Sequence, residues 1–205
     1  MLVTNIRILV FIMMMLAPLA VNAQDDPATK ARVADVRETY RKALADINAV
    51  QKDEDIPKND ALISLRLIRP GAGPSTETLE FYAELKEDSV KGTQNEAFFI
   101  RRNYNVATRN YYNEFLFDRV TGDLIFAYVR SSSEDKPNIK VEDRYYFNNG
   151  SLVPIWHTTT GVDTEKNVTI GEKQIDEYKW KEEESFFNVV PENLRTAFRL
   201  LGNNL

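Results

Sequence analysis

Residues 108–130 decide the fold of this chain; they read TRNYYNEFLFDRVTGDLIFAYVR. Two apolar segments, 108–118 and 123–130, lie on either side of a short polar stretch that contains Thr121-Gly122. Such a stretch is typical of a type I turn closed by a glycine in the left-handed region, which joins two strands into a hairpin. Strands connected this tightly are antiparallel, so the pattern predicts an antiparallel meander.

Period-two patterns extend this sheet in both directions along the chain. Alternation is cleanest at residues 78–85, where one side of the predicted strand has Leu79, Phe81, Ala83 and Leu85. Such alternation indicates one buried and one solvated face. The triplet Asn148-Asn149-Gly150 is a further hairpin signal. Together these patterns predict six to seven strands, the remaining ones at 62–69, 97–104, 139–147 and 152–157.

Helices are expected to cover the sheet, because the strand at 123–130 is apolar on both of its sides. Pro27 suits the first position of an N-terminal helix. That helix has an apolar stripe at steps of three and four, formed by Val33, Val36, Tyr40, Leu44, Ile47 and Val50. Helical patterning returns at 172–188, after a polar loop, and Pro191 is expected to open a last helix. One face of that helix has Leu194, Ala197, Phe198 and Leu201.

The fold class predicted from these patterns is α+β. It consists of an N-terminal amphipathic helix, a curved antiparallel β-meander of six to seven strands, and C-terminal helices packed on the sheet.

The first 23 residues predict a cleavable export signal. Arg7 supplies a positive charge, residues 8–19 are apolar, and Val21-Asn22-Ala23 offers the small residues that a signal peptidase reads. The apolar run is shorter than the roughly 20 residues that a membrane-spanning helix needs. We interpret 1–23 as a signal peptide and 24–205 as a single α+β domain.

The chain has no cysteine. A bacterial lipid-anchored precursor needs a Cys directly after its signal peptide, and small eukaryotic secreted domains commonly depend on disulfides. These considerations favour a periplasmic or secreted protein of a Gram-negative bacterium, with no stable membrane anchor after signal cleavage. The chain has 26 basic and 31 acidic residues and no basic block, which argues against nucleic acid as a partner.

Motifs for catalysis and metal binding are missing from the sequence. His157 is the only histidine, which excludes zinc sites built from two or more, and no GxSxG motif accompanies it. The loop 70–75 has two glycines but lacks the pattern of a phosphate-binding loop. The acidic residues at 53–55 and the pair Asp118 and Asp123 lack the spacing of a calcium-binding EF-hand. We therefore predict no catalytic residue, no metal and no cofactor.

Aromatic and arginine side chains are concentrated in the predicted sheet. Such side chains are enriched in interfaces, so a sheet face that displays them is a candidate binding surface. The alternative is ordinary cross-strand packing with Arg/Glu pairs on a solvated face. The predicted binding residues are Tyr112, Arg144, Tyr146, Arg109 and Trp156.

A resemblance accompanies these patterns. The segments Phe98 to Asn105, Tyr112 to Asp118, Thr121 to Phe126 and Arg144 to Phe147 resemble a group of uncharacterised exported proteins from Gram-negative gut anaerobes. The resemblance implies export and a β-meander. It implies no functional residue, because its motifs specify hairpins.

The function predicted from the sequence is non-enzymatic. We expect an exported binding or interaction protein that contacts a protein, peptide or glycan through the sheet face or through the concavity between sheet and helices. One alternative is a periplasmic carrier of a lipid or other apolar ligand, for which a continuous apolar cavity would be required. Another is a carboxylate-based hydrolase, for which two convergent carboxylates would be required.

Overall fold

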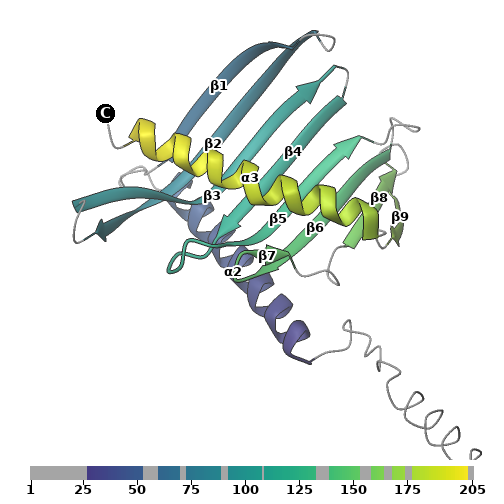
Figure 1. The fold of residues 1–205 in the computed structure, drawn as a ribbon, viewed down its shortest axis with the longest axis horizontal. Helices are drawn as coiled ribbons and strands as arrows, with labels where there is room; N and C mark the ends of the chain where they lie inside the picture. The colour runs from purple at the N-terminus through teal and green to yellow at the C-terminus, as the bar shows by residue number, and fades with distance from the viewer. Residues whose placement is uncertain are drawn as a thin grey trace, which may run out of the picture.

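The computed structural model has an α+β fold with one helix near each end and an antiparallel sheet between them (Figure 1). It describes residues 27–52, 60–69, 73–88, 92–107, 109–132, 139–152, 158–163, 168–173 and 177–202. The helices are α2 (Pro27–Lys52) and α3 (Glu177–Gly202). The predicted fold class is therefore confirmed at this level.

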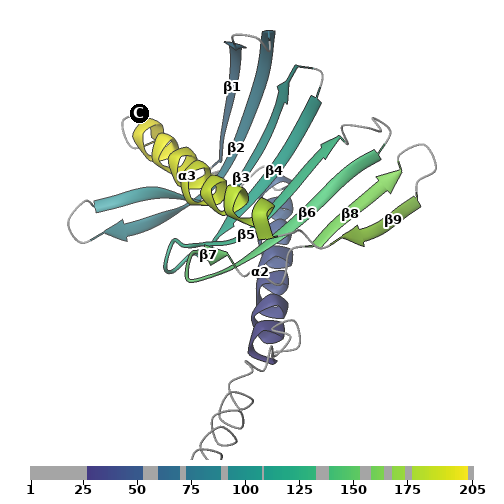
Figure 2. The ribbon, with the colours of Figure 1, turned by 45° about the vertical axis from the view of Figure 1, so that its right-hand side comes forward.

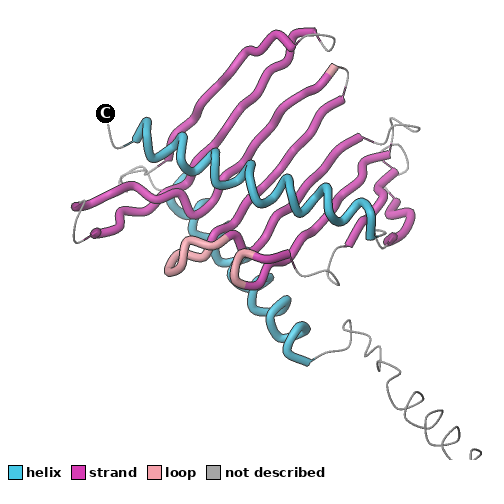
Figure 3. Tube along the Cα trace, in the orientation of Figure 1, coloured by secondary structure: helices cyan, strands magenta, loops and turns pink. Residues whose placement is uncertain are grey.

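The sheet is open and follows the chain from one strand to the next (Figure 3). The strand order is β1-β2-β3-β4-β5-β6-β8-β9, every pair is antiparallel, and the short β7 pairs with β6. The strands are β1 (Asp60–Arg69), β2 (Gly73–Asp88), β3 (Gly92–Val106), β4 (Arg109–Phe117), β5 (Leu124–Ser132), β6 (Ile139–Asn148), β7 (Ser151–Leu152), β8 (Thr158–Asp163) and β9 (Val168–Lys173). The predicted meander is confirmed.

Both predicted hairpin turns have the backbone that their residues favour. Gly122 has a φ of 78° between β4 and β5. Asn149 and Gly150 have φ of 49° and 73° between β6 and β7. Two successive positive φ values are the signature of a type I′ turn, which Asn-Gly adopts at low cost.

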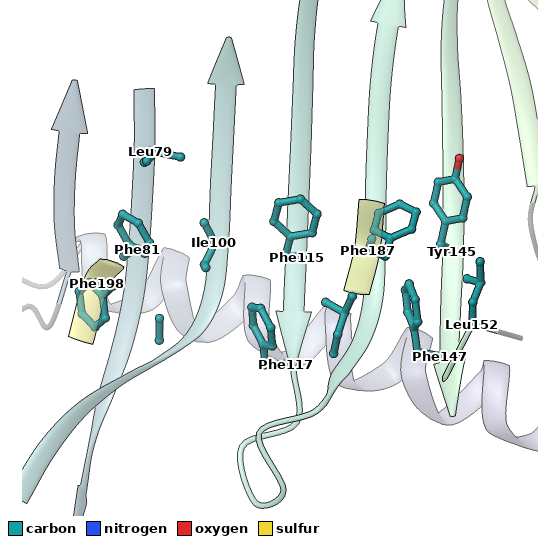
Figure 4. Packing of buried hydrophobic residues seen from close by; sticks show 13 residues of the cluster. Leu79, Phe81, Ile100, Phe115, Phe117, Tyr145, Phe147, Leu152, Phe187 and Phe198 are labelled. Atoms are coloured by element: carbon teal, nitrogen blue, oxygen red, sulfur yellow. The ribbon is translucent and has the colours of Figure 1, made fainter. Parts of the chain in front are cut away.

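The two helices cover opposite faces of the sheet (Figure 1, Figure 2). On the α3 face, Phe187 and Phe198 pack into a buried apolar cluster with side chains of β2 to β7 (Figure 4). The ring of Phe198 stacks on that of Phe81 with centroids 5.0 Å apart. On the α2 face, Val33, Val36 and Ile47 belong to a second buried cluster with side chains of β2 to β6. The apolar stripe predicted for the N-terminal helix is therefore the face that it buries.

Two strands, β8 and β9, extend the sheet in a region that was predicted to be a polar loop. Their sequences, TTTGVD and VTIGEK, contain no clean alternation of apolar and polar residues. They are strands because β8 pairs with β6 and β9 pairs with β8, and such tertiary context overrides weak local preference.

The C-terminal helical region is one helix rather than two. Pro191 lies inside α3, although proline usually begins a helix because it lacks an N–H donor. The Pro191 side chain is fully buried, on the same side as Phe187 and Phe198. This packing compensates for the lost backbone hydrogen bond. The predicted apolar face is wrong in part, since Leu201 is 51% exposed.

Leu85 also departs from its predicted environment. Leu79 and Phe81 are buried as expected, but Leu85 is 60% exposed. The end of β2 and the start of β3 project beyond the rest of the sheet as a two-stranded ribbon (Figure 2). Leu85 lies on that ribbon, where α3 does not cover it.

Candidate functional site

The α2 face of the sheet has an apolar row of side chains next to a polar one. The apolar row consists of Phe99, Leu116, Phe126 and Tyr146, which are paired across β3 to β6. All four are buried, in the cluster that also contains Val36 of α2. Two residues further along the strands, the polar row consists of Arg101, Glu114, Tyr128 and Arg144, again paired across β3 to β6.

Glu114 is the centre of the polar row and is 5% exposed. Its carboxylate accepts hydrogen bonds from the hydroxyls of Tyr40, on α2, and Tyr112, on β4. The Nε atom of Arg101 lies 3.3 Å from Glu114 Oε1 and donates to it. A buried carboxylate is costly unless it is paired and hydrogen-bonded, and Glu114 has both kinds of partner.

The tyrosines around Glu114 are held in their neutral form. Burial, followed by the hydrogen bond to Glu114, raises the pKa of Tyr40 and that of Tyr112 far above the ordinary value. Burial and the neighbouring Glu142 carboxylate raise the pKa of Tyr128 in the same way. All three hydroxyls therefore keep their protons over the physiological pH range.

Two arginines lie beside these tyrosines. The guanidinium carbon of Arg130 is 4.8 Å from the centre of the Tyr112 ring, and that of Arg144 is 5.4 Å from the centre of the Tyr128 ring. Arg144 Nη2 also lies 3.3 Å from Glu142 Oε2. Among the described residues, no carboxylate lies within 4.0 Å of the Arg130 guanidinium. The neighbour of this guanidinium is the Tyr112 ring.

These side chains surround a pocket of about 440 Å³ between α2 and strands β4 to β6. We call it the tyrosine-arginine pocket; its lining residues are Tyr40, Tyr112, Glu114, Phe126, Tyr128, Arg130 and Arg144. It combines aromatic rings with two cations and one compensated carboxylate. Such a mixture suits recognition of a polar ligand.

The predicted binding residues are only partly brought together. Tyr112 and Arg144 line the tyrosine-arginine pocket. Tyr146 lies beneath α2, 1% exposed, where its hydroxyl accepts a hydrogen bond of 3.0 Å from Arg37 Nε. Arg109 is in β4 with Phe115 and Phe117, at the odd-numbered positions that face α3, so it lies on the other side of the sheet. Trp156 and His157 lie outside the described residues.

The predicted binding residues did not include five of the seven residues that line the pocket. Phe126, Tyr128 and Arg130 belong to the aromatic and arginine concentration of the predicted sheet, whereas Tyr40 and Glu114 do not. Tyr40 belongs to the apolar stripe of the N-terminal helix, so the helical period alone gives it a packing role. Glu114 had a usable signal. It shares a strand face with Tyr112 and Leu116, and a carboxylate at a buried position of a sheet requires a buried partner.

A second hollow lies at the C-terminal end of α2. It has a volume of about 340 Å³ and includes apolar side chains of α2 and β3, among them Ile47, Val50 and Phe98. Arg119 closes one side of it. The Arg119 guanidinium lies 4.0 Å from the centre of the Phe98 ring and 2.9 Å from Asp46 Oδ2.

In the turn between β4 and β5, the carboxylate of Asp118 stabilises the backbone by hydrogen bonding. Asp118 Oδ1 accepts hydrogen bonds of 2.8 Å from the N–H groups of Val120 and Thr121. The bond from Thr121 is the main cause of a lowered Asp118 pKa. Within the part of the chain that the structure describes, no group of three or more His, Cys, Asp or Glu side chains is placed to hold a metal ion.

Among the helices of the described ranges, none combines the length and the apolar character that crossing a membrane requires.

Comparison of this chain with models of protein families, with curated proteins and with solved structures found no match.

Proposed function

We propose that this protein is an exported, non-enzymatic binding protein, and that its ligand binds in the tyrosine-arginine pocket. The observation that supports this proposal most strongly is the state of Arg130. Its guanidinium lies on the pocket wall with an aromatic neighbour and no carboxylate among the described residues within 4.0 Å. An arginine in that state is available to a ligand.

Binding is favoured over hydrolysis because the carboxylates near the pocket already have partners. Glu114 accepts hydrogen bonds from two tyrosines and from Arg101, and Glu142 is paired with Arg144. A general acid or base needs an oxygen that reaches the substrate. In this arrangement both carboxylates instead orient the side chains around them.

A carrier of an apolar ligand is the second candidate, and the hollow at the end of α2 is the observation that favours it. Its volume of about 340 Å³ is at the lower end of the range for small-molecule pockets. Two buried apolar clusters, one beneath each helix, fill much of the space between the sheet and the helices. The binding proposal also includes a curved sheet, because curvature would make the tyrosine-arginine pocket concave toward its ligand.

Export belongs to the same proposal. The supports are the charge, the apolar run and the small-residue site within residues 1–23, and the resemblance to exported proteins of Gram-negative bacteria. Intact mass measurement of the protein made in a Gram-negative host would test it. We expect a chain that begins after Ala23; a retained Met1 would contradict export with cleavage.

The binding proposal is tested by screening labelled protein on glycan and peptide arrays, with two variants of adjacent tyrosines. Tyr112→Ala removes a ring of the pocket, whereas Tyr111→Ala removes the same ring from the other face of β4, where Tyr111 stacks on Tyr104. We expect Tyr112→Ala to weaken binding at least tenfold and Tyr111→Ala to leave it unchanged. Thermal unfolding checks that both variants are folded.

Two results would contradict the proposal. One is equal binding by wild-type protein and folded Tyr112→Ala. The other is cleavage of an array ligand, detected by mass spectrometry and abolished by Glu114→Gln in a folded protein. That second result would establish the carboxylate-based hydrolase.

A further inference from the structure

The tyrosine-arginine pocket selects for one chemical class of ligand. We infer that the pocket binds an acidic saccharide, through a carboxylate of the sugar at Arg130 and through sugar hydroxyls at Tyr40 and Tyr112. This inference rests on the proposed function, because it names the ligand of the same pocket. It is built from the hydrogen-bonding state of each lining side chain.

We expect the Arg130 guanidinium to bind an anionic group of the ligand. The carboxylate directly across the sheet from Arg130 is Glu142 of β6, but Glu142 Oε2 is engaged by Arg144 Nη2 at 3.3 Å. The Tyr112 ring under the Arg130 guanidinium positions it without neutralising its charge. The planar guanidinium matches a carboxylate through two parallel hydrogen bonds.

We expect the hydroxyl oxygens of Tyr40 and Tyr112 to accept hydrogen bonds from donors on the same ligand. Each of Tyr40 and Tyr112 has one O–H proton, and both protons go to Glu114. What these hydroxyls still offer is oxygen lone pairs, which accept hydrogen bonds. A simple carboxylate has no donor for them, whereas a sugar acid has several hydroxyls beside its carboxylate.

A peptide fits this place less well than a saccharide. Peptides bind sheets mainly by adding a strand to a free edge. The pocket lies over β4, β5 and β6, each of which is paired with a strand on both sides. The ligand therefore meets side chains only. The rings of Tyr112 and Tyr128, beside the guanidinium groups of Arg130 and Arg144, are partly exposed and offer apolar surface to the C–H groups of a sugar.

The charges of the site match a ligand that places one acidic group at Arg130. Glu114 is paired with Arg101, which also lies 3.7 Å from Glu80, and Glu142 is paired with Arg144. Among the described residues, no carboxylate lies within 4.0 Å of Arg130. The chain as a whole has a net charge of −5. The attraction of a carboxylate is therefore local to Arg130 and is not a property of the chain as a whole.

The test uses isothermal titration of the mature protein with three probes: oligogalacturonate, the same oligosaccharide as its methyl ester, and oligoglutamate. The variants are Arg130→Gln, in the pocket, and Arg119→Gln as a matched control at the other hollow. We expect the wild-type protein to bind oligogalacturonate, and to bind the methyl ester and oligoglutamate at least tenfold more weakly. Arg130→Gln should weaken oligogalacturonate binding at least tenfold, and Arg119→Gln should not change it.

Each of the other outcomes contradicts a stated part of the inference. Equal binding of the methyl ester, with no effect of Arg130→Gln, would remove the acidic group from the inference. Tighter binding of oligoglutamate would make the ligand an acidic peptide. If no saccharide binds but another array ligand depends on Tyr112, the inference fails and the proposed function stands. If no ligand depends on Tyr112, both fail.

Discussion

The two faces of the sheet differ in how their helices cover them. On the α3 face, Phe187 and Phe198 enter a cluster of aromatic and aliphatic side chains (Figure 4). On the α2 face, the helix covers one apolar row, and beside that row lies a polar one around the buried carboxylate of Glu114. A single strand such as β4 contributes to both, with Phe115 on one side and Glu114 on the other.

Apolar burial and a buried polar network contribute differently to the fold. Apolar burial is non-directional, and it stabilises the α3 face in proportion to the area that is covered. A buried polar network contributes less net stability, but it fixes side chains in one arrangement when every member is satisfied. Apolar clusters lie on both faces, and buried polar groups also lie on the α3 face, where Arg102 Nε is 2.8 Å from Glu77 Oε1. What distinguishes the α2 face is that its polar row lines a pocket, in which we propose that the ligand binds.

The largest effect is expected where the α3 face is most completely buried. Phe81→Ala removes a ring that is fully buried and stacked on Phe198. We expect the free energy of unfolding in urea to fall by about 3 to 5 kcal/mol, the range for removing a buried phenylalanine ring. A loss below about 1 kcal/mol would show that α3 is not needed to close this face.

A smaller loss of stability is expected at the centre of the α2 face. Glu114→Gln keeps the shape of the side chain but removes the charge opposite Arg101 and one acceptor of the tyrosine hydrogen bonds. We expect urea unfolding to report a loss of about 1 to 3 kcal/mol, the usual cost of an unsatisfied buried polar group. A loss as large as that of Phe81→Ala would show that the polar row contributes as much stability as a fully buried aromatic ring.

An acid-dependent effect is expected at the edge of the α3 face. Burial opposes ionisation of Glu96, but hydrogen bonds and charges of Arg199 and Arg195 outweigh it, so the Glu96 pKa is lowered from its ordinary value of 4.5. A lowered pKa stabilises the folded protein above the ordinary value, and this stabilisation is lost as the pH falls through the lowered one. Urea unfolding of wild-type protein and Glu96→Gln between neutral pH and pH 3 should show a steeper acid loss in the wild type. If the free energy of unfolding depends on pH in the same way in both proteins, the ion pairs between Glu96 and α3 do not stabilise the fold.

The smallest effect is expected at the rim of the α2 face. The Glu80 side chain is 34% exposed, and its carboxylate lies 3.7 Å from Arg101 and accepts a hydrogen bond from Tyr82. A partly exposed ion pair contributes little, so Glu80→Ala should cost well under about 1 kcal/mol in urea unfolding. If its cost equals that of Glu114→Gln, the polar row acts as a unit rather than around Glu114.

The sequence predicted the parts of this fold that depend on local chemistry. Gly122 and Asn149-Gly150 specify their turns through positive φ, and the alternation at Leu79 and Phe81 places β2 correctly. It did not predict β8, because that strand depends on its pairing with β6, nor the continuity of α3 through Pro191, because that depends on burial.

The candidate site was less accessible to sequence reasoning. Tyr112 and Arg144 were identified from composition, but Tyr40 reaches Glu114 from an element 74 positions away in sequence. The periodic patterns of helices and strands relate residues only a few positions apart, so they cannot predict a contact over that separation. Arg109 was grouped with Tyr112 although the two-residue period of β4 places them on opposite faces. Period alone would have separated them.

The strand order also determines how the chain folds in time. From β1 to β6 each strand pairs with the next one, so these contacts are local in sequence and their loop-closure cost is small. The side chains that cover the α3 face are different, because Phe187 and Phe198 are synthesised after all the strands that they cover. Until they emerge from the ribosome, the apolar face formed by Phe81, Phe115 and their neighbours stays uncovered. Nascent chains truncated before α3 should therefore be the form of this protein most prone to aggregation.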